Sequence, residues 1–205
     1  MLIIVTNKDL VKNDYLSQIE EIIKAKPSKI ILREKQLNKS EYFNLSKKII
    51  SISNRYNVDL VIHNYIDIGK FFNINSIHLP FNKFNKNKDD LHEFDKVGVS
   101  VHSLKEAKIV GDSYADYIIV GHIFQTQTKK NLVPKGLKFL KEVKDSINIP
   151  IYAIGGINLK TINSVLETGV NGVAIMSDLM ESNNPHEKVL EYKKILNNYK
   201  QDPNE

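Results

Sequence analysis

Eight short runs of apolar and β-branched residues recur along this chain, and segments with helical spacing separate most of them. Several runs lack the alternation of a half-exposed strand, as expected for parallel strands that are buried on both faces. The predicted strands are Leu2–Val5, Lys29–Leu32, Asp59–Ile62, Ser76–Leu79, Gly98–Val101, Tyr117–Val120, Ile151–Ile154 and Gly172–Ile175. The 205 residues allow about 26 residues for each unit of strand, helix and loops. The pattern therefore predicts an α/β protein, a single (β/α)8 TIM barrel over residues 1–200 with a polar C-terminal tail at 201–205.

Helical spacing of apolar residues predicts the helices between these strands. Tyr42, Leu45 and Ile49 share one helix face after Ser40, which is the expected N-cap. The predicted helices are Tyr15–Ala25, Ser40–Tyr56, Ser103–Val110, Leu137–Ser146, Leu159–Glu167 and Pro185–Tyr199, with a polar loop at Asn82–Asp90. An open, doubly wound sheet is the rival fold, but its first turn is usually rich in glycine. The first turn here, at residues 6–9, has no glycine, so the barrel is favoured.

Composition excludes several kinds of protein. The chain has no cysteine, which excludes disulfide frameworks, thiolate zinc sites, iron–sulfur clusters and cysteine nucleophiles. No apolar run approaches the roughly 18 residues of a membrane span, and the first residues lack the basic region of a signal peptide. The net charge of +5 is spread along the chain rather than gathered in one stripe. We therefore expect a cytoplasmic protein with no nucleic-acid or membrane partner.

A glycine turn follows the seventh predicted strand. Active sites of such barrels form at the carboxyl ends of the strands, and phosphate groups usually bind after strands seven and eight. Gly155 and Gly156 let backbone N–H groups approach an anion closely. After the eighth strand, Met176 leads to Ser177, which adds an N–H group and a hydroxyl. These positions predict a phosphate-binding site.

Four of the six histidines lie at or near predicted strand ends: His63, His78, His102 and His122. Imidazole titrates near neutral pH and can both accept and donate a proton, and Gly121 leaves room for a ligand beside His122. His122 is therefore the candidate acid/base, while the roles of the other three stay open. No metal site is predicted, because the chain has no His-x-His or Glu-x-x-His pair.

Six segments carry a resemblance to a known superfamily, in order and over nearly the whole predicted barrel. They are Ile31–Lys35, Gly98–Ser103, Gly121–Thr126, Thr128–Lys130, Ile149–Ile157 and Val165–Ser177. Together they resemble the thiamine phosphate synthase / TenI superfamily. The resemblance implies a (β/α)8 barrel that acts on thiazole phosphates in thiamine biosynthesis.

That superfamily has two branches, and this chain departs from the synthase branch at three places. The synthase branch joins a pyrimidine diphosphate to a thiazole phosphate and uses magnesium held by aspartates. Its Asn-Asp after the third strand is His63-Asn64 here, and the aspartate of its Gly-Gln-x-Asp after the fourth strand is Lys83. Its glutamine two residues before Arg33 is Ile31. A lysine repels a divalent cation where a carboxylate would bind it.

The second branch is that of the thiazole tautomerase, whose Gly-His-Val-Phe segment resembles residues 121–124 here, Gly-His-Ile-Phe. The sequence therefore predicts a thiazole tautomerase-like isomerase, which moves a proton on a carboxythiazole phosphate with His122 as the acid/base and needs no cofactor. The substrate-binding or phosphate-binding residues are predicted to be Arg33, Lys35, Asn64, Ser100, Thr126, Thr128, Lys129, Gly155, Gly156, Met176 and Ser177.

Two alternatives stay open. One is a thiamine phosphate synthase that joins hydroxymethylpyrimidine diphosphate and thiazole phosphate, with Mg²⁺ as its cofactor. The other is a non-catalytic regulatory protein that binds thiazole or thiamine phosphates. In each case the expected partner is a small-molecule thiazole phosphate, and the sequence is compatible with a homodimer.

Overall fold

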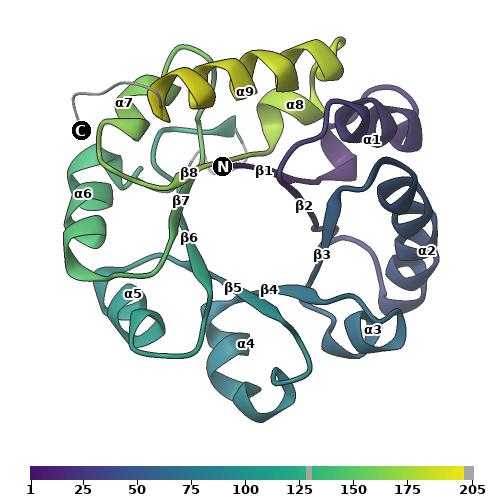
Figure 1. Ribbon diagram of the computed structural model, residues 1–205, viewed down its shortest axis with the longest axis horizontal. Coiled ribbons are helices and arrows are strands. Elements are labelled where there is room, and N and C mark those ends of the chain that lie inside the picture. The colour runs from purple at the N-terminus through teal and green to yellow at the C-terminus, as the bar shows by residue number, and fades with distance from the viewer. Residues whose placement is uncertain (128–130, 201–205) are drawn as a thin grey trace.

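Eight parallel strands form a closed barrel in the computed structural model, which describes residues 1–127 and 131–200 (Figure 1). The strands are β1 (Leu2–Val5), β2 (Lys29–Leu32), β3 (Asp59–His63), β4 (Ser76–Pro80), β5 (Lys96–Val101), β6 (Tyr117–Gly121), β7 (Ile151–Ile154) and β8 (Gly172–Ile175). Each strand pairs with its neighbours in sequence, and β1 closes the barrel against β8 with Leu2 opposite Val173. The predicted (β/α)8 barrel is confirmed. The predicted tail at 201–205 lies outside the described residues.

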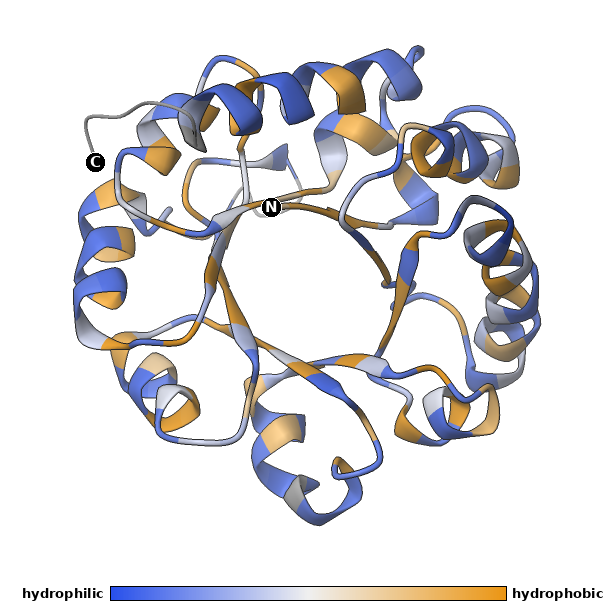
Figure 2. Cartoon of the chain, viewed as in Figure 1, coloured by the Kyte–Doolittle hydropathy of each residue, from blue (hydrophilic) through white to orange (hydrophobic). Residues whose placement is uncertain are grey.

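Helices surround the barrel, so that strands and helices alternate along the chain (Figure 1). The α-helices are α1 (Tyr15–Lys24), α2 (Lys39–Tyr56), α3 (Ile66–Phe71), α4 (Phe81–Lys86), α5 (Leu104–Gly111), α6 (Gly136–Ser146), α7 (Ile162–Leu166), α8 (Ser177–Met180) and α9 (Pro185–Lys200), with short 3-10 helices η1 (Lys8–Leu10) and η2 (Lys88–Asp90). Colouring by hydropathy shows mostly apolar strands and helices of mixed polarity around them (Figure 2). This is the pattern of a sheet covered by amphipathic helices.

The start of α2 differs from the prediction. The helix begins at Lys39 and its N-cap is Asn38, whose side chain accepts a hydrogen bond from the backbone N–H of Glu41 (3.0 Å). The Glu41 carboxylate accepts the backbone N–H of Asn38 in return (2.9 Å). This reciprocal capping box satisfies two N–H groups at once, which the Ser40 hydroxyl alone could not do.

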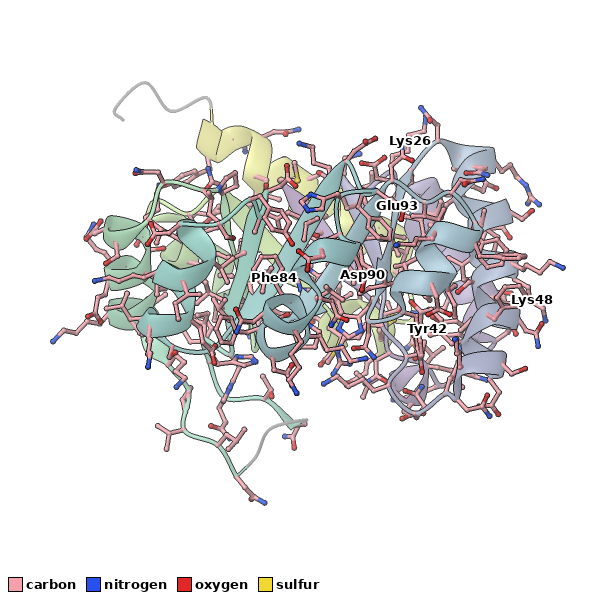
Figure 3. The ribbon with its side chains drawn as sticks, turned by 90° about the horizontal axis from the view of Figure 1, so that it is seen from below. Lys26, Tyr42, Lys48, Phe84, Asp90 and Glu93 are labelled. Atoms are coloured by element: carbon pink, nitrogen blue, oxygen red, sulfur yellow. The ribbon has the colours of Figure 1, made fainter. Side chains whose placement is uncertain are left out.

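Two short α-helices, α3 and α4, and the 3-10 helix η2 were not predicted. The segment Asn82–Asp90 was expected to be a polar loop, but it lies within α4 and η2, and α3 follows β3 directly. Phe84 explains α4, because its ring is fully buried and fixes the helix to the barrel (Figure 3). A single apolar anchor in a polar segment gives no helical periodicity in the sequence.

The barrel has an apolar interior as well as an apolar layer under the helices. Side chains alternate along each strand, so that Leu2 and Ile4 pack toward the helices while Ile3 and Val5 point inward. The interior cluster is Ile3, Val5, Ile31, Val61, Tyr117, Ile119, Tyr152 and Ala174. These side chains fill the barrel and leave the open space at its carboxyl end.

The two ends of the barrel differ in their loops. Lys26 lies between α1 and β2 at one end, and the chain after β6 projects from the opposite end (Figure 3). That opposite end carries the carboxyl ends of the strands. No helix in the described part of the chain is long and apolar enough to cross a membrane.

Candidate active site

A cavity of about 390 Å³ lies at the carboxyl ends of the strands, where barrels of this kind bind their substrates. Most of the predicted site residues line it: Arg33, Lys35, Ser100, His122, Thr126, Gly155, Gly156, Met176 and Ser177. Asn64 does not line it, and its backbone N–H instead donates to the His78 carbonyl (3.1 Å). Thr128 and Lys129 lie outside the described residues.

One side of the cavity carries cationic side chains from the end of β2. Alternation places Arg33 and Lys35 on the cavity side and turns the intervening Glu34 away from it. The buried Glu34 carboxylate accepts hydrogen bonds from the Thr6 hydroxyl (2.5 Å) and the Tyr15 hydroxyl (2.7 Å). Burial lowers the pKa of Arg33, and burial together with Arg33 lowers that of Lys35.

Further contacts fix the end of β2. The Glu34 carboxylate also accepts the Lys8 backbone N–H (2.7 Å) and the Gln36 side-chain amide (2.8 Å). The backbone N–H of Arg33 donates to the Thr6 hydroxyl (3.0 Å). The Glu34 carboxylate thus accepts its hydrogen bonds from neutral donors, and it does not form an ion pair with Arg33.

A third cation lies beside this side of the cavity. The Lys83 ammonium, on α4, is 3.5 Å from the backbone carbonyl of Asn64, the residue that follows the cavity-lining His63. The positions that the resemblance assigned to two aspartates, Asn64 and Lys83, are therefore spatial neighbours. An amide and an ammonium occupy them instead.

Two buried histidines form the floor of the cavity. The rings of His63 and His78 stack with centroids 6.1 Å apart, and His78 contacts the hydroxyls of Tyr117 (3.3 Å) and Ser100 (2.7 Å). Burial, with a smaller contribution from Arg33, lowers the pKa of His78 to about 3. Burial also lowers the pKa of His63, and the nearby positive charges of Arg33, Lys35 and Lys83 lower it further. Both rings are therefore neutral at pH 7.

The other two histidines have backbone partners. His122 is 4% exposed, and its Nε2 lies 3.3 Å from the carbonyl oxygen of Leu132 in the loop after β6. The backbone carbonyl of His122 accepts the N–H of Lys135 (2.9 Å). The exposed His102 places its Nδ1 2.7 Å from the Gly121 carbonyl oxygen. His122 thus links both ends of the loop after β6 while it lines the cavity.

The glycine turn after β7 forms another side of the cavity. Gly155 and Gly156 have φ values of +103° and +68°, a region that favours glycine. A Cβ on Gly155 would lie 2.3 Å from the Cβ of His122, and a Cβ on Gly156 would lie 2.7 Å from the Gln125 carbonyl oxygen. The glycines therefore allow the loops after β6 and β7 to pack against each other.

Ser177 opens α8 on this same side. The first turn of a helix leaves N–H groups without partners inside the helix, and they favour an anion. The glycine turn and the start of α8 lie side by side because β7 pairs with β8. This arrangement brings Gly155, Gly156 and Ser177 together in the lining of the cavity.

Several lining residues were not predicted, among them Asn158, Gln125, Gln127, Asp178 and Glu181. All but Glu181 lie within two residues of a predicted site residue, so the rule that selected strand ends could have included them. Glu181 follows α8, four residues after Ser177, and no sequence signal indicated it. The Asp178 carboxylate is already bound, because it accepts the Tyr192 hydroxyl (2.6 Å) and pairs with the Lys188 ammonium (3.2 Å).

Comparison with known proteins gives one consistent result. The family model described as thiamine monophosphate synthase matches residues 2–179. A thiamine-phosphate synthase of Clostridium tetani is 35% identical over 185 residues, 87% of each chain, and one of Methanobrevibacter smithii is 35% identical over 90% of this chain and 89% of that one. Among solved structures, a thiamine phosphate pyrophosphorylase from Pyrococcus furiosus has a TM-score of 0.82 and 25% identity, covering 97% of this chain and 96% of that one.

These relatives contradict the predicted isomerase. Curated relatives that match most of this chain are named synthases, so the prediction of a thiazole tautomerase is wrong and the synthase alternative is the better one. The prediction gave most weight to local exchanges, His122 and Lys83, in a chain that is similar to synthases over most of its length. Residue exchanges at a few positions alter how a ligand is held, and by themselves they do not identify the reaction.

Proposed function

Because the chain belongs to the thiamine monophosphate synthase family, we propose that it is a thiamine-phosphate synthase, a transferase that joins a pyrimidine diphosphate to a thiazole phosphate. The observation that carries the proposal is one cavity lined on one side by cationic side chains and on another by a glycine turn and a helix start. Arg33 and Lys35 form a cationic side at the end of β2. Gly155, Gly156 and Ser177 form a backbone-lined side at the ends of β7 and β8.

The two sides suit two phosphorylated substrates. A diphosphate carries more charge than a monophosphate and has the greater need for cationic side chains, so we assign it to Arg33 and Lys35. The thiazole monophosphate then occupies the glycine turn and the start of α8, where N–H groups contact its oxygens. The cavity of about 390 Å³ lies in the size range of small-molecule sites.

The reaction needs charge stabilisation more than it needs a proton acceptor. The lone pair of the thiazole ring nitrogen forms a bond to the methylene carbon of the pyrimidine, and the bond from that carbon to the diphosphate oxygen breaks. The diphosphate leaves with the electron pair, so negative charge grows on it in the transition state. Cations that already point at this charge stabilise the transition state. The neutral His63 and His78 at the floor add no positive charge of their own.

The residues present do not fit a magnesium ion, which the resemblance implies for synthases. No group of three or more histidine or carboxylate side chains able to hold a metal occurs in residues 1–127 and 131–200. Mg²⁺ prefers carboxylate oxygens, and the two expected carboxylate positions are Asn64 and Lys83. Asp178, a carboxylate that lines the cavity, is paired with Lys188. We therefore derive no step through a metal.

The proposal is tested by incubating the purified protein with hydroxymethylpyrimidine diphosphate and thiazole phosphate together and measuring thiamine phosphate and released diphosphate. We expect the two products in equal amounts, with no product when either substrate is omitted. Absence of thiamine phosphate under conditions where the protein binds both substrates would overturn the proposal and favour the non-catalytic binding protein.

A further inference from the structure

Three cations lie at or beside the cationic side of the cavity, and Lys83 is the one that does not line it. Arg33 and Lys35 line the cavity, and the Lys83 ammonium is 3.5 Å from the carbonyl oxygen of Asn64 beside it. Arg33 and Lys35 share the cavity wall with His63, and Asn64, whose carbonyl contacts Lys83, is the next residue after His63. They come from the ends of two different units of the barrel, so the fold rather than the local sequence brings them together.

None of these three cations has a carboxylate within 4.0 Å in the described part of the chain. Other lysines are paired, since Lys39 pairs with Asp67 and Lys70 pairs with Glu93. Like charges held together without a counter-ion repel one another. An anion in the cavity would relieve that repulsion.

The carboxylates near the cavity do not supply this anion. The Glu34 charge acts favourably on Arg33 and offsets part of the repulsion, but its oxygens accept hydrogen bonds from Thr6 and Tyr15 on the side away from the cavity. Asp178 and Glu181 lie on α8 or directly after it, on the glycine side, and Asp178 is paired with Lys188. The cationic side is therefore open to an anionic ligand.

We infer that Arg33, Lys35 and Lys83 bind the diphosphate directly and take the place of a divalent metal ion in this protein. The inference rests on the proposed function for the identity of the anion. Two carboxylates and a divalent cation together carry no net charge, whereas Asn64 and Lys83 together carry one positive charge without any metal. The Lys83 ammonium thus supplies attraction for the diphosphate, and it repels a divalent cation.

The first test is calorimetric titration of the full chain with inorganic diphosphate, in EDTA and in excess Mg²⁺. We expect binding in EDTA at least as tight as in Mg²⁺. The variant Lys83→Ala is expected to weaken binding in EDTA about tenfold, the effect of one charge-assisted contact. The matched control is Lys86→Ala, one turn further along α4 and exposed, which is expected to bind as the wild type does.

The second test reverses the exchange. In the double variant Asn64→Asp/Lys83→Asp, two carboxylates replace the amide and the ammonium, so we expect diphosphate binding to be lost in EDTA and restored by Mg²⁺. Far-ultraviolet circular dichroism and the thermal midpoint show whether each variant is folded. A double variant that does not fold leaves the comparison of wild type, Lys83→Ala and Lys86→Ala to decide.

The outcomes separate this inference from the proposed function. Wild-type binding that disappears in EDTA and returns with Mg²⁺ would overturn the inference even if thiamine phosphate is formed. Equal weakening by Lys83→Ala and Lys86→Ala would also overturn it. Metal-independent diphosphate binding that depends on Lys83, with no product from the two substrates, would support the inference and refute the synthase function.

Discussion

In the proposed function, the two sides of the cavity bind anions by different physical means. The cationic side uses long side chains, Arg33, Lys35 and Lys83, whereas the glycine side uses backbone N–H groups at Gly155 and the neighbouring residues. A side chain can be exchanged while the backbone keeps its path, but a backbone site exists only while the loops are packed correctly. The chemistry of the cationic side can therefore change without loss of the fold, and the glycine side cannot change in this way.

The largest effect is expected on the glycine side, for Gly155→Ala. Its φ of +103° is unfavourable for alanine, and the new Cβ would lie 2.3 Å from the Cβ of His122. We expect kcat/KM to fall more than about 100-fold and the free energy of unfolding to fall by about 2–4 kcal/mol. Steady-state kinetics and urea unfolding measure the two quantities.

Gly136→Ala is the matched control for this substitution. Gly136 also has a positive φ, +76°, but a Cβ there would meet no atom within 4 Å. Only the backbone conformation is then unfavourable, at a cost of about 1 kcal/mol, and kcat/KM should change little. If the two glycine variants lost activity equally, packing against the loop after β6 would not be what the glycine side requires.

A smaller effect, confined to activity, is expected on the cationic side for Arg33→Ala. The guanidinium lines the cavity, and the one hydrogen bond of this side chain in the described part of the chain is to the Met176 sulfur at 4.0 Å. The substitution removes the positive charge of the guanidinium from the proposed diphosphate site, so kcat/KM should fall about 10- to 100-fold. The thermal midpoint should stay close to that of the wild type.

Arg55→Ala is the control for a change of charge alone. Arg55 is an exposed residue of α2 that pairs with Glu20 (2.9 Å), away from the cavity. Its loss should leave kcat/KM unchanged. A large loss of stability in Arg33→Ala would contradict the view that the cationic side can vary independently of the fold.

The floor between the two sides links stability to pH. Burial lowers the pKa of His78 from 6.5 to about 3 in the folded protein, so between these values the unfolded chain binds more protons. The stability contributed by the neutral ring is therefore present above pH 6.5 and is lost as the pH falls toward 3. Between pH 7 and pH 5 the expected loss is about 2 kcal/mol from this histidine.

The variant His78→Gln should reduce this pH dependence, measured by urea unfolding at pH 7 and pH 5. Part of it should remain, because the pKa of His63 is lowered as well. His92→Gln, an exposed position, is the control and should keep the wild-type slope. A wild-type protein equally stable at both pH values would show that the histidines of the floor are not held neutral.

The barrel could be predicted because its signals are repeated and local. Runs such as Lys29–Leu32 and Ile151–Ile154 have the predicted bounds, since β-branched residues in polar surroundings mark a buried parallel strand. The short helices α3 and α4 could not be predicted. Each has six residues and is fixed by few buried side chains, such as Ile68 and Phe84, which is too short for a helical period.

The site could be predicted in position but not in chemistry. Strand ends identified Arg33, Gly155 and Ser177, because every carboxyl end of a closed parallel barrel meets at one face. The sequence could not show that Lys83 and Asn64 are neighbours, because that contact depends on how α4 packs. Nor could it show that His122 contacts the Leu132 carbonyl across its loop.

The smallest effect is expected at a position of the cationic side that acts through its backbone. Asn64 has a φ of +74°, its side chain does not line the cavity, and its carbonyl oxygen lies 3.5 Å from the Lys83 ammonium. Asn64→Gly keeps that carbonyl and suits the positive φ, so kcat/KM should stay within about threefold and stability within about 1 kcal/mol.

Asn64→Val is the contrasting variant, since a β-branched side chain is strongly disfavoured at this φ. It should lower the free energy of unfolding by more than the glycine variant does, and diphosphate binding should weaken with it because the carbonyl beside Lys83 moves. If Asn64→Gly lost as much activity as Asn64→Val, the amide side chain that both variants lack would be the functional group, and the backbone at this position would not be.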